Sequence, residues 1–184
     1  RRAEALQYYD RLAAEYPGSH HLEQAEWTKR ELTLPGQPAP DVPLTSLDTA
    51  APPIRPAALD ARAVLIDFWA TWCTPCVEEM PTLHAAYEEW AERGLEIVSI
   101  SFDDTRDEVH TFRKVWPMPW LHGFEGRSAA VNGEVWEAYA IGGLPHTVLI
   151  DESGRIVETG QALKGERLQE TLRQLLGEGS PGER

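Results

Sequence analysis

Two cysteines, separated by two residues, are the residues of this sequence best suited to chemistry. They lie in Trp72-Cys73-Thr74-Pro75-Cys76, and the chain of 184 residues holds no other cysteine. A strand that leads into Cys-x-x-Cys at the start of a helix is the context of a redox motif. The first thiol then lies at a helix N-terminus, where unpaired backbone N–H groups and the helix dipole favour its thiolate. The second thiol follows one turn later, close enough to form a disulfide with the first.

The segments around this motif predict an α/β fold. The near-continuous apolar run 63–70 is typical of a buried parallel strand, and residues 76–93 are expected to form a helix that ends at Gly94. Similar alternation predicts strand 95–102, helix 105–115, a short strand near Leu121, helix 131–139, a hairpin of strands 146–151 and 156–160, and helix 165–176. We therefore expect a central mixed sheet that is flanked by helices on both faces.

The chain divides into four expected segments. Residues 1–34 are predicted to form a helical hairpin, broken at Tyr16-Pro17-Gly18-Ser19. Residues 35–62 contain seven of the fourteen prolines and are predicted to be a Pro-rich linker with an N-terminal β-hairpin of short strands, around 42–47 and 53–55. Residues 63–176 form the main domain, and residues 177–184, rich in Gly, Ser and Pro, are expected to be a flexible tail.

Composition narrows the partners. The formal net charge of −13 disfavours nucleic acid and anionic membranes, which are both polyanions. No apolar run approaches the ~20 residues of a membrane span. Two cysteines in one motif leave no structural disulfide framework, which is compatible with the cytoplasm and the periplasm alike. The chain begins Arg-Arg-Ala without Met, so we expect a fragment of a longer precursor, and any membrane anchor would lie outside this sequence.

A longer motif carries a resemblance to a known family. Asp67-Phe-Trp-Ala-Thr-Trp-Cys-Thr-Pro-Cys-Val-Glu-Glu-Met-Pro81, with Gly143-Leu-Pro145 farther along, resembles the thioredoxin fold. More narrowly, the chain is similar to thiol–disulfide oxidoreductases of the TlpA/ResA type, in the redoxin or AhpC/TSA-like superfamily. The resemblance covers about residues 36–176. Residues 1–34 also resemble the junction of two tetratricopeptide repeats, although a plain helical hairpin fits the same residues.

The resemblance assigns roles within the motif. Cys73 is the expected nucleophile, which attacks a substrate disulfide, and Cys76 is the resolving thiol. Trp72 is expected to shield the disulfide and to form part of the substrate surface, and Pro75 restricts the loop. The alternative is a zinc site, but a structural zinc site takes four ligands, and the sequence has no second Cys-x-x-Cys or His-x-His. We therefore expect neither a metal nor a bound cofactor, because the Cys73–Cys76 pair itself carries the electrons.

A second part of the expected site is Leu144-Pro145. In the family the matching proline is cis and lies against the disulfide, and a cis X-Pro bond is rare enough to be a retained feature. The backbone of Leu144 would then pair with the substrate chain like an added strand. An ordinary trans turn is the alternative. His146 stands where the family usually has Thr, and it either titrates near the disulfide or is a hydrogen-bonded strand residue.

Two carboxylates complete the expected catalytic set. Asp67 lies six residues before Cys73 and matches the buried acid of thioredoxins, whereas Glu79 matches an acid that ResA-like proteins place near their thiols. A buried carboxylate has a raised pKa and can accept the Cys76 proton, through a water, as a general base. The alternatives are a purely structural buried acid at Asp67 and a solvated side chain at Glu79.

We therefore predict a thiol–disulfide oxidoreductase that exchanges disulfides with proteins, in the reducing direction, outside the cytoplasm. Its partners would be protein thiols or disulfides and an upstream electron donor. One alternative is a thiol peroxidase, but the peroxidatic motif Pro-x-x-x-Thr-x-x-Cys is absent, since Asp67 stands four residues before Thr71. The other alternative is a non-enzymatic adaptor that binds partners through its repeat-like helices.

Overall fold

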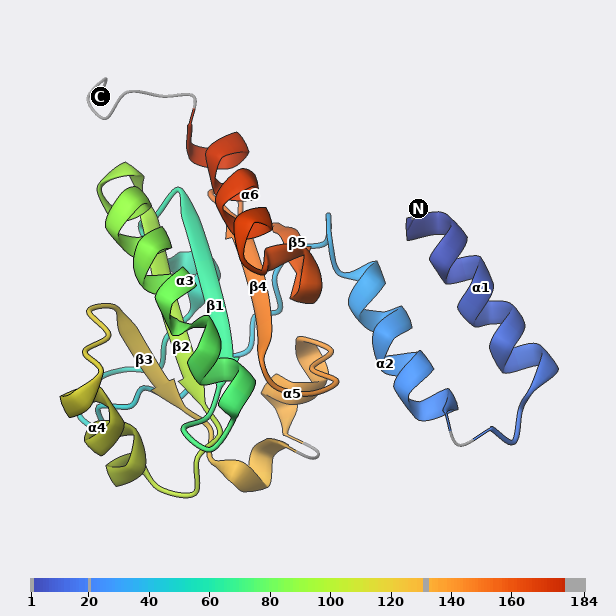
Figure 1. Cartoon of the computed structure of the whole chain (residues 1–184), viewed down its shortest axis with the longest axis horizontal. Coiled ribbons are helices and arrows are strands. Elements are labelled where there is room, and N and C mark those ends of the chain that lie inside the picture. Colours follow the sequence, from blue (N-terminus) through green and yellow to red (C-terminus); the bar gives the residue numbers. More distant parts are fainter. Residues whose placement is uncertain (1, 20, 131–132, 178–184) are drawn as a thin grey trace.

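A five-stranded mixed sheet forms the centre of the computed structural model, which describes residues 2–19, 21–130 and 133–177. The strand order is β3-β2-β1-β4-β5 (Figure 1). The strands are β1 (Ala63–Trp69), β2 (Leu95–Ser101), β3 (Leu121–Phe124), β4 (His146–Asp151) and β5 (Ile156–Thr159). Strands β1, β2 and β3 are parallel, β4 is antiparallel to β1, and β5 is antiparallel to β4 and so runs in the same direction as β1. This is the thioredoxin-like α/β fold that the sequence predicts.

The central strand β1 is buried along its whole length because both faces of the sheet are covered. Successive side chains of a strand point to opposite faces. Leu65 and Trp69 belong to one core cluster, whereas Val64, Ile66 and Phe68 belong to the other. Asp67 has the same parity as Leu65 and Trp69, so it points toward the first cluster.

Helices and a long irregular segment cover the two faces (Figure 1). The helices are α1 (Arg2–Glu15), α2 (Leu22–Thr33), α3 (Thr74–Trp90), α4 (Arg106–Val115), α5 (Glu134–Ala138) and α6 (Glu166–Leu176). Side chains from α3, α4 and α6 pack into the core cluster that contains Leu65 and Trp69. Side chains from α5 and from the segment 34–61 pack into the opposite cluster. Helices therefore flank both faces, as expected.

The N-terminal helical hairpin is present as α1 and α2, which lie beside the sheet at its β5 side in Figure 1. Helix α1 has no buried residue and contacts α2, where the Lys29 Nζ atom lies 2.5 Å from an Asp10 carboxylate oxygen. Helix α2 contacts the main domain through Arg30, which binds both the carboxylate and the backbone carbonyl of Glu137 at 2.8 Å. Within the described residues, no helix has the length and apolar character needed to cross a bilayer.

Some element boundaries differ from the sequence predictions. Helix α3 begins at Thr74 rather than at residue 76, because Cys73 itself caps the helix. The strands expected around 42–47 and 53–55 are reduced to isolated bridges, one of which pairs Leu44 with Ile54. The helix predicted over 131–139 is α5, and residues 131–132 of that prediction lie outside the described residues. So do residues 178–184 of the predicted tail.

Candidate redox site

The two cysteines form a disulfide at the N-terminus of α3. The S–S distance is 2.02 Å and the Cα atoms are 5.2 Å apart. Cys73 is the N-cap residue, and the backbone N–H of Cys76 donates a hydrogen bond to the Cys73 Sγ atom at 3.3 Å. Both residues are buried, with exposed fractions of 6% for Cys73 and 2% for Cys76. When the disulfide opens, the helix N-terminus therefore favours a thiolate on Cys73, the more exposed of the two.

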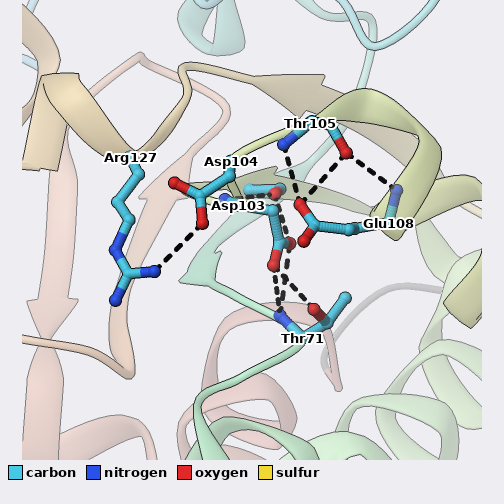
Figure 2. A network of polar contacts seen from close by, with 7 residues as sticks. Thr71, Asp103, Asp104, Thr105, Glu108 and Arg127 are labelled. Atoms are coloured by element: carbon cyan, nitrogen blue, oxygen red, sulfur yellow. Dashed lines mark hydrogen bonds and ion pairs between the residues drawn. The ribbon is translucent and has the colours of Figure 1, made fainter.

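The loop before Cys73 is fastened by a buried aspartate that follows β2. The Asp103 carboxylate accepts hydrogen bonds from the backbone N–H of Thr71 at 3.0 Å and from the Thr71 hydroxyl at 2.6 Å. The Ser101 hydroxyl donates to the same carboxylate at 2.7 Å. Asp103 is fully buried, and charge-assisted hydrogen bonds of this kind are the stronger ones. Figure 2 shows how Asp103 reaches from the end of β2 to Thr71.

The neighbouring residue Trp72 is held from the same loop. Its side chain is 47% exposed, and the guanidinium carbon of Arg127 lies 4.7 Å from its ring centroid. Arg127 in turn forms an ion pair with Asp104 at 3.0 Å (Figure 2). Thus Asp103 and Asp104 position Thr71 and Trp72, the two residues that precede Cys73. Asp103 binds Thr71 directly, whereas Asp104 acts on Trp72 through Arg127, which makes the cation–π contact.

Asp67 lies beneath α3, as the sequence predicts, and is 3% exposed. Burial raises the pKa of Asp67 to about 7, the negative charge of Glu79 raises it as well, and a hydrogen bond from Ser99 opposes both effects. The Ser99 hydroxyl donates to the Asp67 Oδ2 atom at 3.0 Å. This pKa lies close to neutral pH, where a carboxyl group can both release and accept a proton.

Glu79 is half-buried on α3, one helical turn after Cys76. Its electrostatic effect on Asp67 shows that the structure brings the two predicted acids into one environment. The residues Cys73 and Cys76 belong to the core cluster toward which Asp67 points. The disulfide and both acids therefore lie on the same side of the sheet.

The Leu144–Pro145 peptide bond is cis, as the resemblance predicts. Leu144 packs against the core cluster that contains both cysteines, and β4 begins two residues later. His146 is buried, and burial lowers its pKa to about 4, against a hydrogen bond with the backbone of Tyr139. His146 is therefore neutral at physiological pH, which agrees with a hydrogen-bonded strand residue rather than with a group that titrates near the disulfide.

Two pockets lie beside α4. A pocket of about 430 Å³ between the redox loop and the start of α4 is lined by Thr71, Thr105 and Phe112, among others. A larger pocket of about 600 Å³ lies between the segment 46–59 and α4, and none of the predicted site residues lines it. Among the described residues, no group of three or more His, Cys, Asp or Glu side chains could hold a metal ion.

Two features of the site were missed from the sequence. Asp103 follows a buried strand parallel to β1, and the carboxyl ends of neighbouring parallel strands lie at one edge of the sheet. That signal places the acid beside the end of β1, where the cysteine motif begins. The second feature is Trp120, for whose hydrogen bond the sequence carries no signal. Its indole Nε1 atom donates to the Ser99 hydroxyl at 2.9 Å.

Comparisons with known proteins agree with this geometry. The model of the AhpC/TSA family matches residues 35–159. Thiol-disulfide oxidoreductase ResA of Bacillus thuringiensis subsp. konkukian is 31% identical over 160 residues, which cover 87% of each chain. ResA of Oceanobacillus iheyensis is 35% identical over 137 residues, covering 73% of this chain and 69% of its own. The solution structure of a thiol:disulfide interchange protein from Bacteroides sp. superimposes with a TM-score of 0.67 at 25% identity, covering 82% of this chain and 95% of its own.

A disulfide at a helix N-terminus, in a thioredoxin fold with such relatives, defines the class of protein: it is a thiol–disulfide oxidoreductase. More narrowly, the chain belongs to the AhpC/TSA family and is of the TlpA/ResA type.

Proposed function

We propose that this protein reduces disulfides of protein substrates through the Cys73–Cys76 pair, without a bound cofactor. The observation that supports this most is the disulfide at the N-terminus of α3, on the face of the sheet to which Asp67 points. The ResA relatives are named thiol-disulfide oxidoreductases. Those names favour disulfide exchange over the thiol peroxidase that the sequence left as an alternative.

In the first half-reaction, the Cys73 thiolate attacks one sulfur of a substrate disulfide. The substrate S–S bond breaks, a bond forms between Cys73 and that sulfur, and the other substrate sulfur leaves as a thiolate that takes up a proton. The Cys76 N–H, which donates to the Cys73 sulfur, and the α3 dipole stabilise the attacking thiolate. Cys73 is the more exposed cysteine, so it is the one that an incoming disulfide reaches.

In the second half-reaction, the Asp67 carboxylate accepts the proton of the Cys76 thiol, directly or through a water. The Cys76 thiolate attacks the Cys73 sulfur, the mixed disulfide breaks, and the second substrate sulfur leaves as a thiolate. Two electrons have then passed to the substrate, and the protein holds the Cys73–Cys76 disulfide. Burial, and in addition the charge of Glu79, keep the pKa of Asp67 high enough for this proton transfer near neutral pH.

The substrate surface would surround Cys73. Trp72 and Pro75 are exposed on either side of the buried cysteine, and Leu144 and Pro145 are half-buried. The backbone of Leu144 precedes β4 and would pair with an extended substrate segment, as in strand addition. Exposed aromatic rings with a polar edge are well suited to such transient contacts.

We further propose that a dithiol partner upstream returns the disulfide to the reduced state, outside the cytoplasm. The resemblance to TlpA/ResA-type proteins supports this, and it favours a periplasmic or other extracytoplasmic location. The acidic surface argues against nucleic acid as a partner.

A trapping experiment tests the proposal. Cys76→Ser leaves the nucleophile but removes the resolving thiol, so a mixed disulfide between Cys73 and the substrate protein accumulates and is isolated under non-reducing conditions. Cys73→Ser with Cys76 intact is the matched control and should capture far less. The glutathione redox equilibrium of the Cys73–Cys76 pair gives its reduction potential and therefore the direction of electron flow. A protein of this fold that acts as a reductant has a reduction potential of about −270 mV.

Two results would contradict the proposal. One is an equal yield of mixed disulfides from both serine variants, which would mean that Cys73 is not the attacking thiol. The other is stoichiometric, rapid reduction of hydrogen peroxide by Cys73 with slow exchange with protein disulfides, which would restore the peroxidase alternative.

A further inference from the structure

Three buried side chains form a hydrogen-bonded row beneath α3. The register of β1 and β2 places Asp67 directly opposite Ser99. The Ser99 hydroxyl lies 3.0 Å from the Asp67 Oδ2 atom, and the Trp120 Nε1 atom lies 2.9 Å from the Ser99 oxygen. The exposed fractions are 3%, 0% and 6% for Asp67, Ser99 and Trp120. The row is therefore shielded from water.

The direction of the hydrogen bonds in this row follows from the chemistry of its members. An indole N–H can only donate, so the Ser99 oxygen accepts from Trp120. The hydroxyl hydrogen of Ser99 is then directed to Asp67. Among the residues that the structure describes, Ser99 is the one side-chain donor to this carboxylate. A donated hydrogen bond favours the ionised carboxylate, whereas burial disfavours it.

We propose that Ser99 and Trp120 are positioning residues for the proton transfer at the disulfide: Trp120 orients the Ser99 hydroxyl, and Ser99 holds the Asp67 carboxylate ready to accept the Cys76 proton. This inference rests on the proposed function, in which Asp67 is the proton acceptor. Hydrogen bonds in a chain polarise one another, so the loss of the Trp120 donor weakens the bond from Ser99 to Asp67.

Within the described parts of the chain, the other groups that face Asp67 do not donate a hydrogen bond to its carboxylate, as Ser99 does. On α3, Glu79 carries the charge that acts on Asp67, and the two cysteines are joined in the disulfide. On β4, Thr147 lies opposite Asp67, but its hydroxyl donates to the Gly160 carbonyl oxygen, at 3.4 Å. On β3, His122 lies one strand beyond Ser99, and burial lowers its pKa to about 4, so it is neutral.

The first experiment measures the Asp67 titration in the oxidised full chain by carbon-13 NMR of the side-chain carboxyl group, where the cysteines do not titrate. Ser99→Ala is expected to raise the pKa of Asp67 by about one pH unit, as for loss of a hydrogen bond to a charged group. Trp120→Phe should cause a smaller rise in this pKa, since it keeps an aromatic, though smaller, side chain and removes the donor to Ser99. Ser99→Thr retains the hydroxyl and should restore the wild-type titration. Thr147→Val is the matched control and should leave it unchanged.

The second experiment measures the pH dependence of disulfide exchange, as the dithiothreitol-driven reduction of insulin by each of these variants. The rate profiles of Ser99→Ala and Trp120→Phe should move to higher pH in step with their Asp67 titrations. An unchanged Asp67 titration in both variants overturns the inference. A changed pKa of Asp67 with an unchanged pH profile of the exchange rate also overturns the inference, because Asp67 would then titrate without taking part in the proton transfer.

The failure of the proposed function would look different. If the wild-type protein does not reduce insulin, the proposed disulfide exchange fails. The NMR titration can still show the hydrogen bond from Ser99 to Asp67 in that case. If Ser99→Ala does not fold, Trp120→Phe carries the same two measurements, and its unchanged titration and profile would overturn the inference by themselves.

Discussion

The pH dependence of stability should reveal the buried charge of Asp67. The oxidised wild-type protein is compared with Asp67→Asn. In the folded protein, burial raises the pKa of Asp67 from 3.8 to about 7. Between these two values the unfolded chain has already released the proton that the folded protein still binds. Stability therefore falls as pH rises through this window and becomes constant above it.

The magnitude follows from the separation of the two pKa values. That separation is roughly three units, and each unit corresponds to about 1.4 kcal/mol, so the full loss is about 4 kcal/mol above neutral pH. At pH 5 only about 1.5 kcal/mol of it is present. Asp67→Asn has no proton to release, so its stability relative to the wild type should increase by about 3 kcal/mol between pH 5 and pH 8. Any constant effect of the amide cancels in this difference.

Urea unfolding of both oxidised proteins, followed by tryptophan fluorescence, gives the free energy of unfolding at each pH. Glu79→Gln is a useful companion variant. It removes the charge that raises the pKa of Asp67, so its stability should fall less steeply with pH than that of the wild type. Parallel curves for the wild type and Asp67→Asn from pH 5 to pH 8 would refute the reasoning, because Asp67 would then be ionised throughout.

Three further predictions concern the elements that support the site. Asp103→Ala removes the acceptor that holds the redox loop and should lower the free energy of urea unfolding by roughly 2–3 kcal/mol. Asp104→Ala removes only an exposed ion pair and should lower it by less than about 1 kcal/mol. Equal losses would contradict the role of the buried Asp103 carboxylate. Thr105 is the N-cap of α4, and its side chain and that of Glu108 each bind the other residue's backbone N–H. Thr105→Ala should therefore lower the free energy of urea unfolding by about 1 kcal/mol. An unchanged value would show that the cap is dispensable. Gly123→Ala would place a methyl group 2.4 Å from a side-chain atom of β2 and should lower the thermal midpoint, at a cost of about 1–3 kcal/mol, while Gly143→Ala, with no atom within 4 Å of the added group, should leave it nearly unchanged.

The cysteine motif and the strands could be predicted because their signals are local. The apolar run that becomes β1 is buried on both faces, and such a strand has a continuous apolar sequence. The start of α3 was placed two residues late, since the capping atom is the Cys73 sulfur rather than the hydroxyl or carboxylate that usually marks an N-cap. The short strands expected before residue 63 remain isolated bridges, because Pro residues in that segment limit the ladder.

The residues that were missed depend on strand register. A one-residue shift between β1 and β2 would move Ser99 to the opposite face from Asp67, and the sequence alone does not determine that register. The same holds for Trp120, which reaches Ser99 from the start of a third strand. Asp103 was accessible in principle, since it follows a parallel strand next to β1, but its partner is a backbone N–H that carries no sequence signal.

The stability cost of Asp67 is itself an argument for its role. The acid lies on the apolar face of a central strand, between Leu65 and Trp69, with a single side-chain hydrogen bond among the described residues. An apolar residue of similar volume at this position would be expected to make the folded protein more stable at neutral pH. A buried, destabilising carboxyl group on the same side of the sheet as a disulfide is typical of a functional site, because such sites retain groups that lower stability but are needed for the reaction. The acid can transfer protons near neutral pH only because burial and Glu79 raise its pKa while Ser99 limits the rise. The property that makes Asp67 destabilising is therefore the one that the proposed exchange reaction would use.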